Sequence, residues 1–168
     1  HFSPLIGMVH AESIALFREG TTASPGIKRM AELGTPAPLD AEITERTDGG
    51  RLGRLITGDW LPTGTASTEV TVEVDGRTPY VSLVSMIAPS SDWFVAVRRV
   101  YLWEGGWVDR LEAPAVLYDA GTDSGATFTS SDAPTDPPEL IRRLVSPPLG
   151  DGSQVDPPVA HFVFSRIE

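Results

Sequence analysis

The sequence contains no cysteine. This absence excludes disulfide bonds, zinc sites built from thiolates and a cysteine nucleophile. It does not exclude secretion, because a domain of this size can be stable without cross-links. Basic residues are also scarce, with 13 Lys and Arg against 23 Asp and Glu, and the formal net charge is −10. We therefore expect no nucleic-acid partner, since such binding needs clustered Lys and Arg to neutralise phosphates.

Long hydrophobic runs are absent as well. No apolar stretch approaches the roughly 20 residues that a membrane-spanning helix needs, so we expect no transmembrane segment. No secretory signal peptide is visible at the start, which reads HFSPLIG without a methionine. We interpret this as an N-terminus that has been processed or trimmed.

Histidine is rare. The three residues His1, His10 and His161 lack the spacing of zinc ligands. If His1 begins the mature chain, its amine and imidazole could chelate copper, as in oxidative polysaccharide enzymes, provided that a second histidine lies nearby. A trimmed chain is the simpler explanation.

The length of 168 residues suits one domain covering 1–168. The segment SPGIKRMAELG predicts a helix, with Ser24 as the N-cap, Pro25 at the first helical position and Gly34 as the stop. The following TPAPLDAEITER predicts a second short helical piece.

Beyond about residue 50 the hydrophobic period changes to two. Residues 70–74 alternate Val with polar residues, and Asp75-Gly76 then predicts a turn into a second strand. The same pattern of two strands and a turn recurs, with Glu104-Gly105-Gly106 at the turn. In the tail HFVFSRIE apolar and polar residues alternate again, which predicts a strand at a sheet edge. Residues 130–158 indicate a long surface excursion, with a helical turn at PPELIRRL. The sequence therefore predicts a mainly β fold, an antiparallel β-sandwich with one or two short helices.

An acidic loop interrupts this pattern in residues 117–128, which read LYDAGTDSGATF. Asp119 and Asp123 offer two carboxylates among glycines and hydroxyls, the kind of flexible oxygen-rich loop that calcium prefers. Two carboxylates are too few, and the turn APSSDW supplies a third candidate in Asp92. The alternative is that these aspartates only cap turns through hydrogen bonds to the backbone.

Better-known motifs do not fit the loop. An EF-hand counted from Asp119 needs glycine at its sixth position and glutamate at its twelfth, where Ser124 and Ser130 stand. The segment DSG is similar to the nucleophile segment of trypsin-like proteases, but Ala126 replaces its second glycine and no histidine stands in the context of a base. We therefore expect no enzyme.

Four tryptophans, Trp60, Trp93, Trp103 and Trp107, could form a platform for a sugar or a partner. We favour the core for them. Trp93 is expected to pack beneath the Asp92 loop, and Trp103 is expected to stack on Trp107 across a hairpin.

Five ordered motifs resemble the spondin domain family: HFSPLIGMVH, LFREGTTASPGIKRMAELG, MIAPSSDWFVAV, GGWVDRL and YDAGTDSGATF. The resemblance implies a C2-like β-sandwich of extracellular proteins, with calcium bound at one end by loop aspartates. Matched to the family's motifs, these aspartates are Asp92, Asp119 and Asp123.

The chain also departs from the animal members, which carry cysteines around the DW strand and the strand that follows, regions that here hold Phe94 and Trp103, and a glycine where Ala96 stands. It looks like a stand-alone prokaryotic version, so the animal roles are not transferred. The resemblance implies a secreted or cell-surface calcium-binding recognition or adhesion module without catalytic activity. Its partner would be an extracellular protein, a glycan or a lipid headgroup. The alternatives are a structural subunit of a calcium-stabilised surface assembly, which would self-associate, and a copper enzyme acting through His1.

Overall fold

The computed structural model describes residues 1–167, which form eight strands, two α-helices and one short 3₁₀ helix. The strands are β1 (Ile6–His10), β2 (Gly53–Thr57), β3 (Tyr80–Met86), β4 (Trp93–Tyr101), β5 (Arg110–Pro114), β6 (Val116–Asp119), β7 (Arg142–Arg143) and β8 (His161–Ser165). The helices are α1 (Pro25–Leu33), α2 (Leu39–Arg46) and η1 (Asp48–Gly50).

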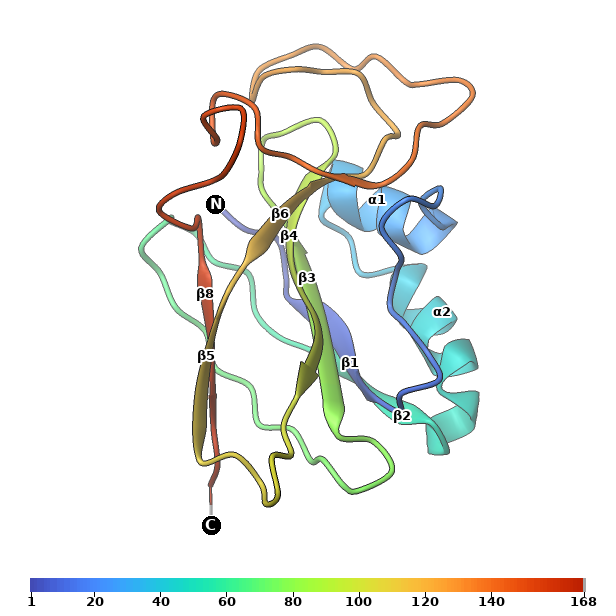
Figure 1. Ribbon diagram of the computed structural model, residues 1–168. Helices are drawn as coiled ribbons and strands as arrows, with labels where there is room; N and C mark the ends of the chain where they lie inside the picture. Colours follow the sequence, from blue (N-terminus) through green and yellow to red (C-terminus); the bar gives the residue numbers. More distant parts are fainter. Residues whose placement is uncertain (168) are drawn as a thin grey trace.

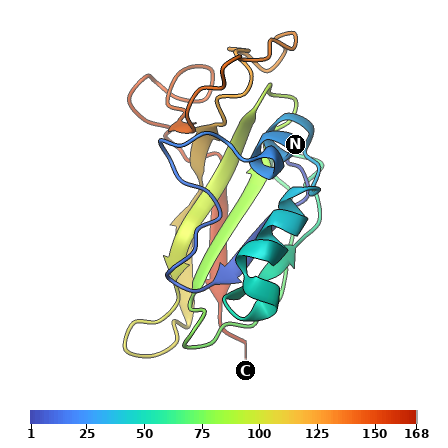
Figure 2. The same ribbon diagram turned by 90° about the vertical axis from the view of Figure 1, so that its right-hand side faces the viewer.

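The strands form two antiparallel sheets. Six of them lie in the order β2-β1-β3-β4-β6-β7, and β5 pairs with β8 in a second, two-stranded sheet. In Figure 1 the helices α1 and α2 cover one side of the central sheet, while β5 and β8 lie on its other side. The turned view of Figure 2 shows both helices lying across the face of the central sheet. The predicted mainly β, antiparallel sandwich with short helices is confirmed.

The central strands are buried because both faces of the sheet are covered. One hydrophobic cluster joins the helices to the sheet, and its members include Ile27, Met30, Leu39, Ile43, Ile6, Met8, Phe94 and Tyr118. On the other face, Leu111, Phe162 and Phe164 of the two-stranded sheet pack against Val81, Leu83 and Val97. The first half of β4 accordingly reads as a continuous apolar run rather than an alternating one.

Helix α1 follows its predicted signals. The Ser24 side chain accepts a hydrogen bond from the Ile27 N–H at 3.2 Å, and Pro25 stands at the first helical position. Gly34 ends the helix with φ of 65°, a left-handed conformation that favours glycine. The second predicted helix is also present, as α2.

Two predicted elements were wrong. Residues 70–74 form no strand: Val72 and Val74 are only partly buried against the core, and the segment is held to β2 by side chains, with Arg54 and Glu73 2.8 Å apart. The predicted turn at Asp75 is present and closes on Thr78.

The segment PPELIRRL forms no helical turn. Its Ile141 is buried in the core, and the Ile141 N–H donates to the Thr21 carbonyl at 2.9 Å instead of to a helical neighbour. The next two residues form β7, which pairs with β6. Pairing with β6, which is distant in the sequence, therefore takes the place of the expected helical turn.

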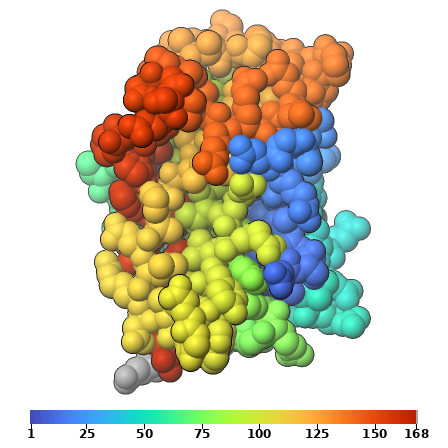
Figure 3. All heavy atoms as spheres, in the orientation of Figure 1, coloured from blue at the N-terminus to red at the C-terminus, as the bar shows by residue number. Residues whose placement is uncertain are grey.

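Long loops from residues 120–160 cover one end of the sandwich, the upper end in Figures 1 and 3. Figure 3 shows that they form a continuous surface over that end. Neither α1 nor α2, nor any other helix within residues 1–167, is long and apolar enough to cross a membrane.

Candidate metal centre

The sheet register places Asp92 beside Asp119. Trp93, the first residue of β4, lies directly opposite Asp119, the last residue of β6, in an antiparallel pair. The Ala120 N–H then donates to the Asp92 carbonyl at 3.1 Å, which joins the two loops where the strands end. The strand pairing alone therefore positions two of the three predicted residues.

Asp92 is fully buried, with 0% of its surface exposed. Its Oδ2 accepts hydrogen bonds from the backbone N–H groups of Thr122 at 2.8 Å and Asp123 at 3.1 Å. These bonds draw the loop after β6 onto the turn before β4. The other carboxylate oxygen, Oδ1, is buried and has no hydrogen-bond partner. A buried acceptor without a partner carries a desolvation penalty, so it requires an explanation.

Asp119 is buried and uses both oxygens. Its Oδ1 accepts from the Gly121 N–H at 2.8 Å, which closes a tight turn. Its Oδ2 lies 2.9 Å from Nη2 of Arg142, which belongs to β7. Asp119 is therefore both a turn cap, as the alternative interpretation expects, and one half of an ion pair.

Asp123 is held by the loop itself. Its Oδ1 accepts from the Gly125 N–H at 2.8 Å and its Oδ2 from the Ala133 N–H at 2.7 Å. Gly125 cannot be replaced without movement, because a Cβ there would lie 1.9 Å from the Ser91 hydroxyl oxygen. The sequence DSG thus allows the loop after β6 to press against the turn that carries Asp92.

The three carboxylates lie close enough to repel one another. The pKa of Asp92 is raised from 3.8 to about 6, first by burial and then by the negative charge of Asp119, with a smaller effect from Asp123. Hydrogen bonds from Thr122 and Asp123 to the Asp92 carboxylate oppose this rise. The site therefore holds more negative charge than its surroundings neutralise.

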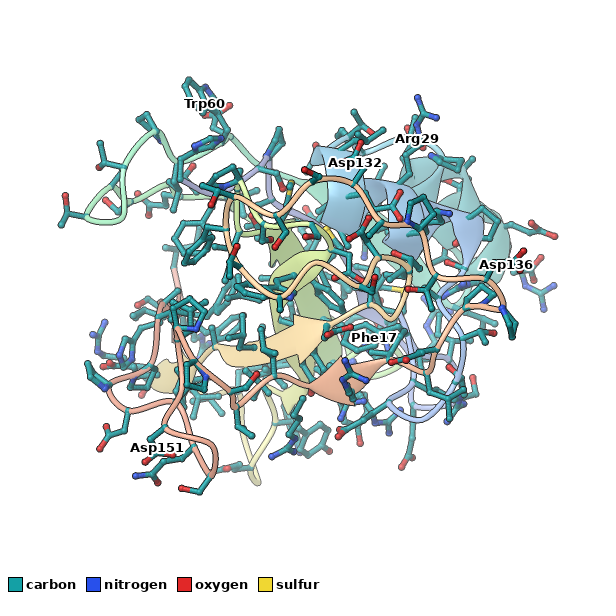
Figure 4. All side chains as sticks on the ribbon, turned by 90° about the horizontal axis from the view of Figure 1, so that it is seen from above. Phe17, Arg29, Trp60, Asp132, Asp136 and Asp151 are labelled. Atoms are coloured by element: carbon teal, nitrogen blue, oxygen red, sulfur yellow. The ribbon has the colours of Figure 1, made fainter. Side chains whose placement is uncertain are left out.

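More acids surround this end of the molecule. Asp132, Asp136 and Asp151 are exposed on the long loops, and the view from above places them around the covered end (Figure 4). Such a rim attracts cations and repels anions.

The donor chemistry fits a hard divalent cation, because every side chain at the centre offers oxygen and the carboxylates retain free lone pairs. The buried Oδ1 of Asp92 is the open ligand. The arrangement is nevertheless that of a closed cluster: in the part of the chain described, no group of three or more His, Asp or Glu side chains is arranged to hold a metal ion. At the cluster, the Arg142 guanidinium lies 2.9 Å from Asp119 Oδ2.

Two of the three histidines belong to strands, His10 to β1 and His161 to β8. His10 is buried and hydrogen-bonded to Ser82 at 2.8 Å, and His161 lies 3.1 Å from Glu112. The ring of His1 meets Trp60 edge to face at a centroid distance of 6.1 Å.

The tryptophan interpretation can be compared residue by residue. Trp93 is buried beneath the Asp92 turn and contacts the Phe128 ring at a centroid distance of 5.3 Å. Trp103 and Trp107 meet edge to face at 5.0 Å, as expected across a hairpin. Trp60 and Trp103 are nevertheless exposed, so the core prediction was wrong for these two.

Sequence reasoning missed Arg142. It lies 23 positions from Asp119, in a segment that reads as a helical turn. No local pattern indicates that this arginine, rather than a neighbour, meets the cluster.

Comparison with known proteins gives a consistent result. The Spondin_N family model matches residues 1–153. Spondin-1 of Rattus norvegicus is 34% identical over 179 residues, which cover 99% of this chain and 22% of the relative. Spondin-2 of Homo sapiens is 31% identical over 169 residues, which cover 99% of this chain and 49% of the relative. The chain thus spans less than half the length of these relatives.

Proposed function

The chain belongs to the Spondin_N family, and from that premise we propose that it is an extracellular recognition or adhesion module, secreted or held at the cell surface. In this proposal it binds calcium through Asp92, Asp119 and Asp123 and carries no catalytic activity of its own.

The observation that carries the calcium proposal is the buried, unpartnered Oδ1 of Asp92. Burial, and after it the negative charge of Asp119, raises the pKa of Asp92 to about 6. A divalent cation supplies the missing positive charge and a partner for that oxygen. In extracellular modules a dissociation constant of about 10⁻⁴ to 10⁻³ M is typical, and it suffices there.

The charge distribution favours a partner that coordinates the calcium ion directly. The exposed Asp132, Asp136 and Asp151 repel anionic groups from this end of the protein. A calcium ion with a free coordination position would offset that repulsion and accept a carboxylate of a protein, an acidic group of a glycan or a lipid phosphate.

A structural subunit of a surface assembly is the second candidate, and one observation favours it. Within residues 1–167, β8 pairs only with β5, so its other edge carries unpaired backbone groups. Concentration-dependent self-association in sedimentation velocity would support this role over capture of a separate ligand by a monomer.

The calcium proposal is tested by thermal melts in calcium chloride and in chelator. Wild type is compared with Asp119→Ala and with Asp132→Ala, a control that removes the same charge from an exposed loop at the same end. At about 100 times the dissociation constant, a bound ion contributes roughly 2.7 kcal/mol. For a domain of this size that corresponds to a rise in Tm of about 5–10 °C.

We expect this rise in wild type and in Asp132→Ala, and its loss in Asp119→Ala. If wild type melts at the same temperature in calcium and in chelator, the aspartates are turn caps alone and the calcium proposal fails.

A further inference from the structure

Arg142 contacts the acidic cluster from the edge of the central sheet. In the β6–β7 pair it lies directly opposite Asp119. Its Nη2 is 2.9 Å from Asp119 Oδ2, while its Nη1 is 2.5 Å from Oε2 of Glu139. The guanidinium therefore bridges one buried acid of the cluster and one acid at the surface.

The two members of this ion pair, Asp119 and Arg142, differ in their exposure to solvent. The Arg142 side chain is 57% exposed, whereas that of Asp119 is 8% exposed. An exposed arginine on a short edge strand can change rotamer at small cost, and Glu139, which Arg142 already contacts, can remain its partner after such a change. The Asp119 side chain is held more firmly, because it is buried and its other oxygen caps the turn at Gly121.

One guanidinium does not neutralise three carboxylates. Asp92 is fully buried beside Asp119 and Asp123, and its Oδ1 has no partner even with Arg142 in place. The three carboxylates therefore keep a net negative charge. Arg142 nevertheless contacts Asp119 Oδ2, an oxygen that a cation bound among the three carboxylates would use. Two cations on the same carboxylate oxygen repel each other.

We propose that Arg142 is a displaceable internal counter-ion: it holds Asp119 in the absence of metal, and when calcium binds it releases Asp119 while keeping its contact with Glu139. This inference rests on the proposed calcium function. It assigns to Arg142 the role of lowering the calcium affinity and of stabilising the metal-free fold. These two effects are linked, because the free energy by which Arg142 stabilises the metal-free state is lost when calcium binds.

The chain provides a matched control in Arg143. It is the other residue of β7, its side chain is 59% exposed, and it lies 3.5 Å from Glu19 rather than near the cluster. Arg142→Gln and Arg143→Gln therefore remove the same charge from adjacent positions of similar exposure. Each variant also loses one contact with a glutamate, Glu139 for Arg142 and Glu19 for Arg143, but only Arg142→Gln loses a contact with Asp119.

The first experiment is calorimetric titration of both variants and wild type with calcium chloride. Exposed ion pairs are worth at most about a factor of five in an equilibrium constant. We expect Arg142→Gln to bind calcium about fivefold more tightly than wild type, and Arg143→Gln to bind with unchanged affinity. Equal affinities for the two variants, or weaker binding by Arg142→Gln, overturn the inference.

The second readout is the melting temperature. In chelator, Arg142→Gln should melt below Arg143→Gln, because its cluster has lost its counter-ion. In saturating calcium that gap should close. A gap of the same size in both conditions indicates a purely structural ion pair and also overturns the inference. A wild type that takes up no calcium overturns the proposed function as well, whereas calcium binding with identical variants overturns this inference alone.

Discussion

Replacing Asp92 by asparagine should stabilise the metal-free protein at neutral pH, although the side chain is fully buried. The pKa of Asp92 is raised from 3.8 to about 6, so the ionised carboxylate costs the folded state free energy. Each pKa unit corresponds to 1.36 kcal/mol, which gives an upper value of about 3 kcal/mol. The asparagine oxygen can still accept from the Thr122 N–H, while its buried amide needs new partners. We therefore expect a net gain below this upper value, about 1–2 kcal/mol.

The pH dependence of this gain follows from the direction of the shift. A raised acid pKa means that the folded state binds the proton more tightly than the unfolded state. The contribution of Asp92 to stability is therefore greatest below pH 3.8 and declines as the pH rises through about 6. The advantage of Asp92→Asn over wild type should be full near pH 7.5 and shrink toward pH 4.

The assay is urea unfolding of wild type and Asp92→Asn in chelator across this pH range. In saturating calcium the order should reverse, because the neutral amide is a poorer ligand and binding stabilises wild type only. A variant that is less stable than wild type in chelator at neutral pH refutes the reasoning. So does an advantage that does not change with pH.

Two further substitutions test the local geometry, each by urea unfolding. Ser24→Ala removes the side-chain acceptor at the start of α1 and should cost about 1 kcal/mol. Gly125→Ala places a methyl group 1.9 Å from the Ser91 hydroxyl oxygen and should cost about 1–3 kcal/mol, with a loss of calcium affinity. Gly64→Ala is its control, because a Cβ there meets nothing within 4 Å; equal effects at both glycines, or a neutral Ser24→Ala, would contradict these contacts.

The sequence predicted those parts of the molecule in which short-range chemistry decides the structure. Ser24, Pro25 and Gly34 set both ends of α1 through bonds within a few residues. The sequence also predicted that the three aspartates lie close together, because acids in turns can be recognised at strand ends and an antiparallel pair brings such ends together. Their proximity was predictable, whereas calcium binding itself stays a prediction.

The rest depended on contacts between distant segments. Residues 70–74 alternate like a strand but form no backbone ladder; Val72 and Val74 pack partly against the core, and Glu73 forms an exposed ion pair with Arg54 of β2. Residues 137–144 read as a helical turn, but burial of Ile141 and its bond to Thr21 select an extended edge instead. That edge carries Arg142 to Asp119, a pairing that no local pattern encodes.

The most direct test of the central claim is a crystal structure grown in calcium, with the ion located by anomalous diffraction. The account predicts a peak bounded by the carboxylates of Asp92, Asp119 and Asp123, with the Arg142 guanidinium turned off Asp119. No peak in saturating calcium, with Arg142 still on Asp119, would contradict it.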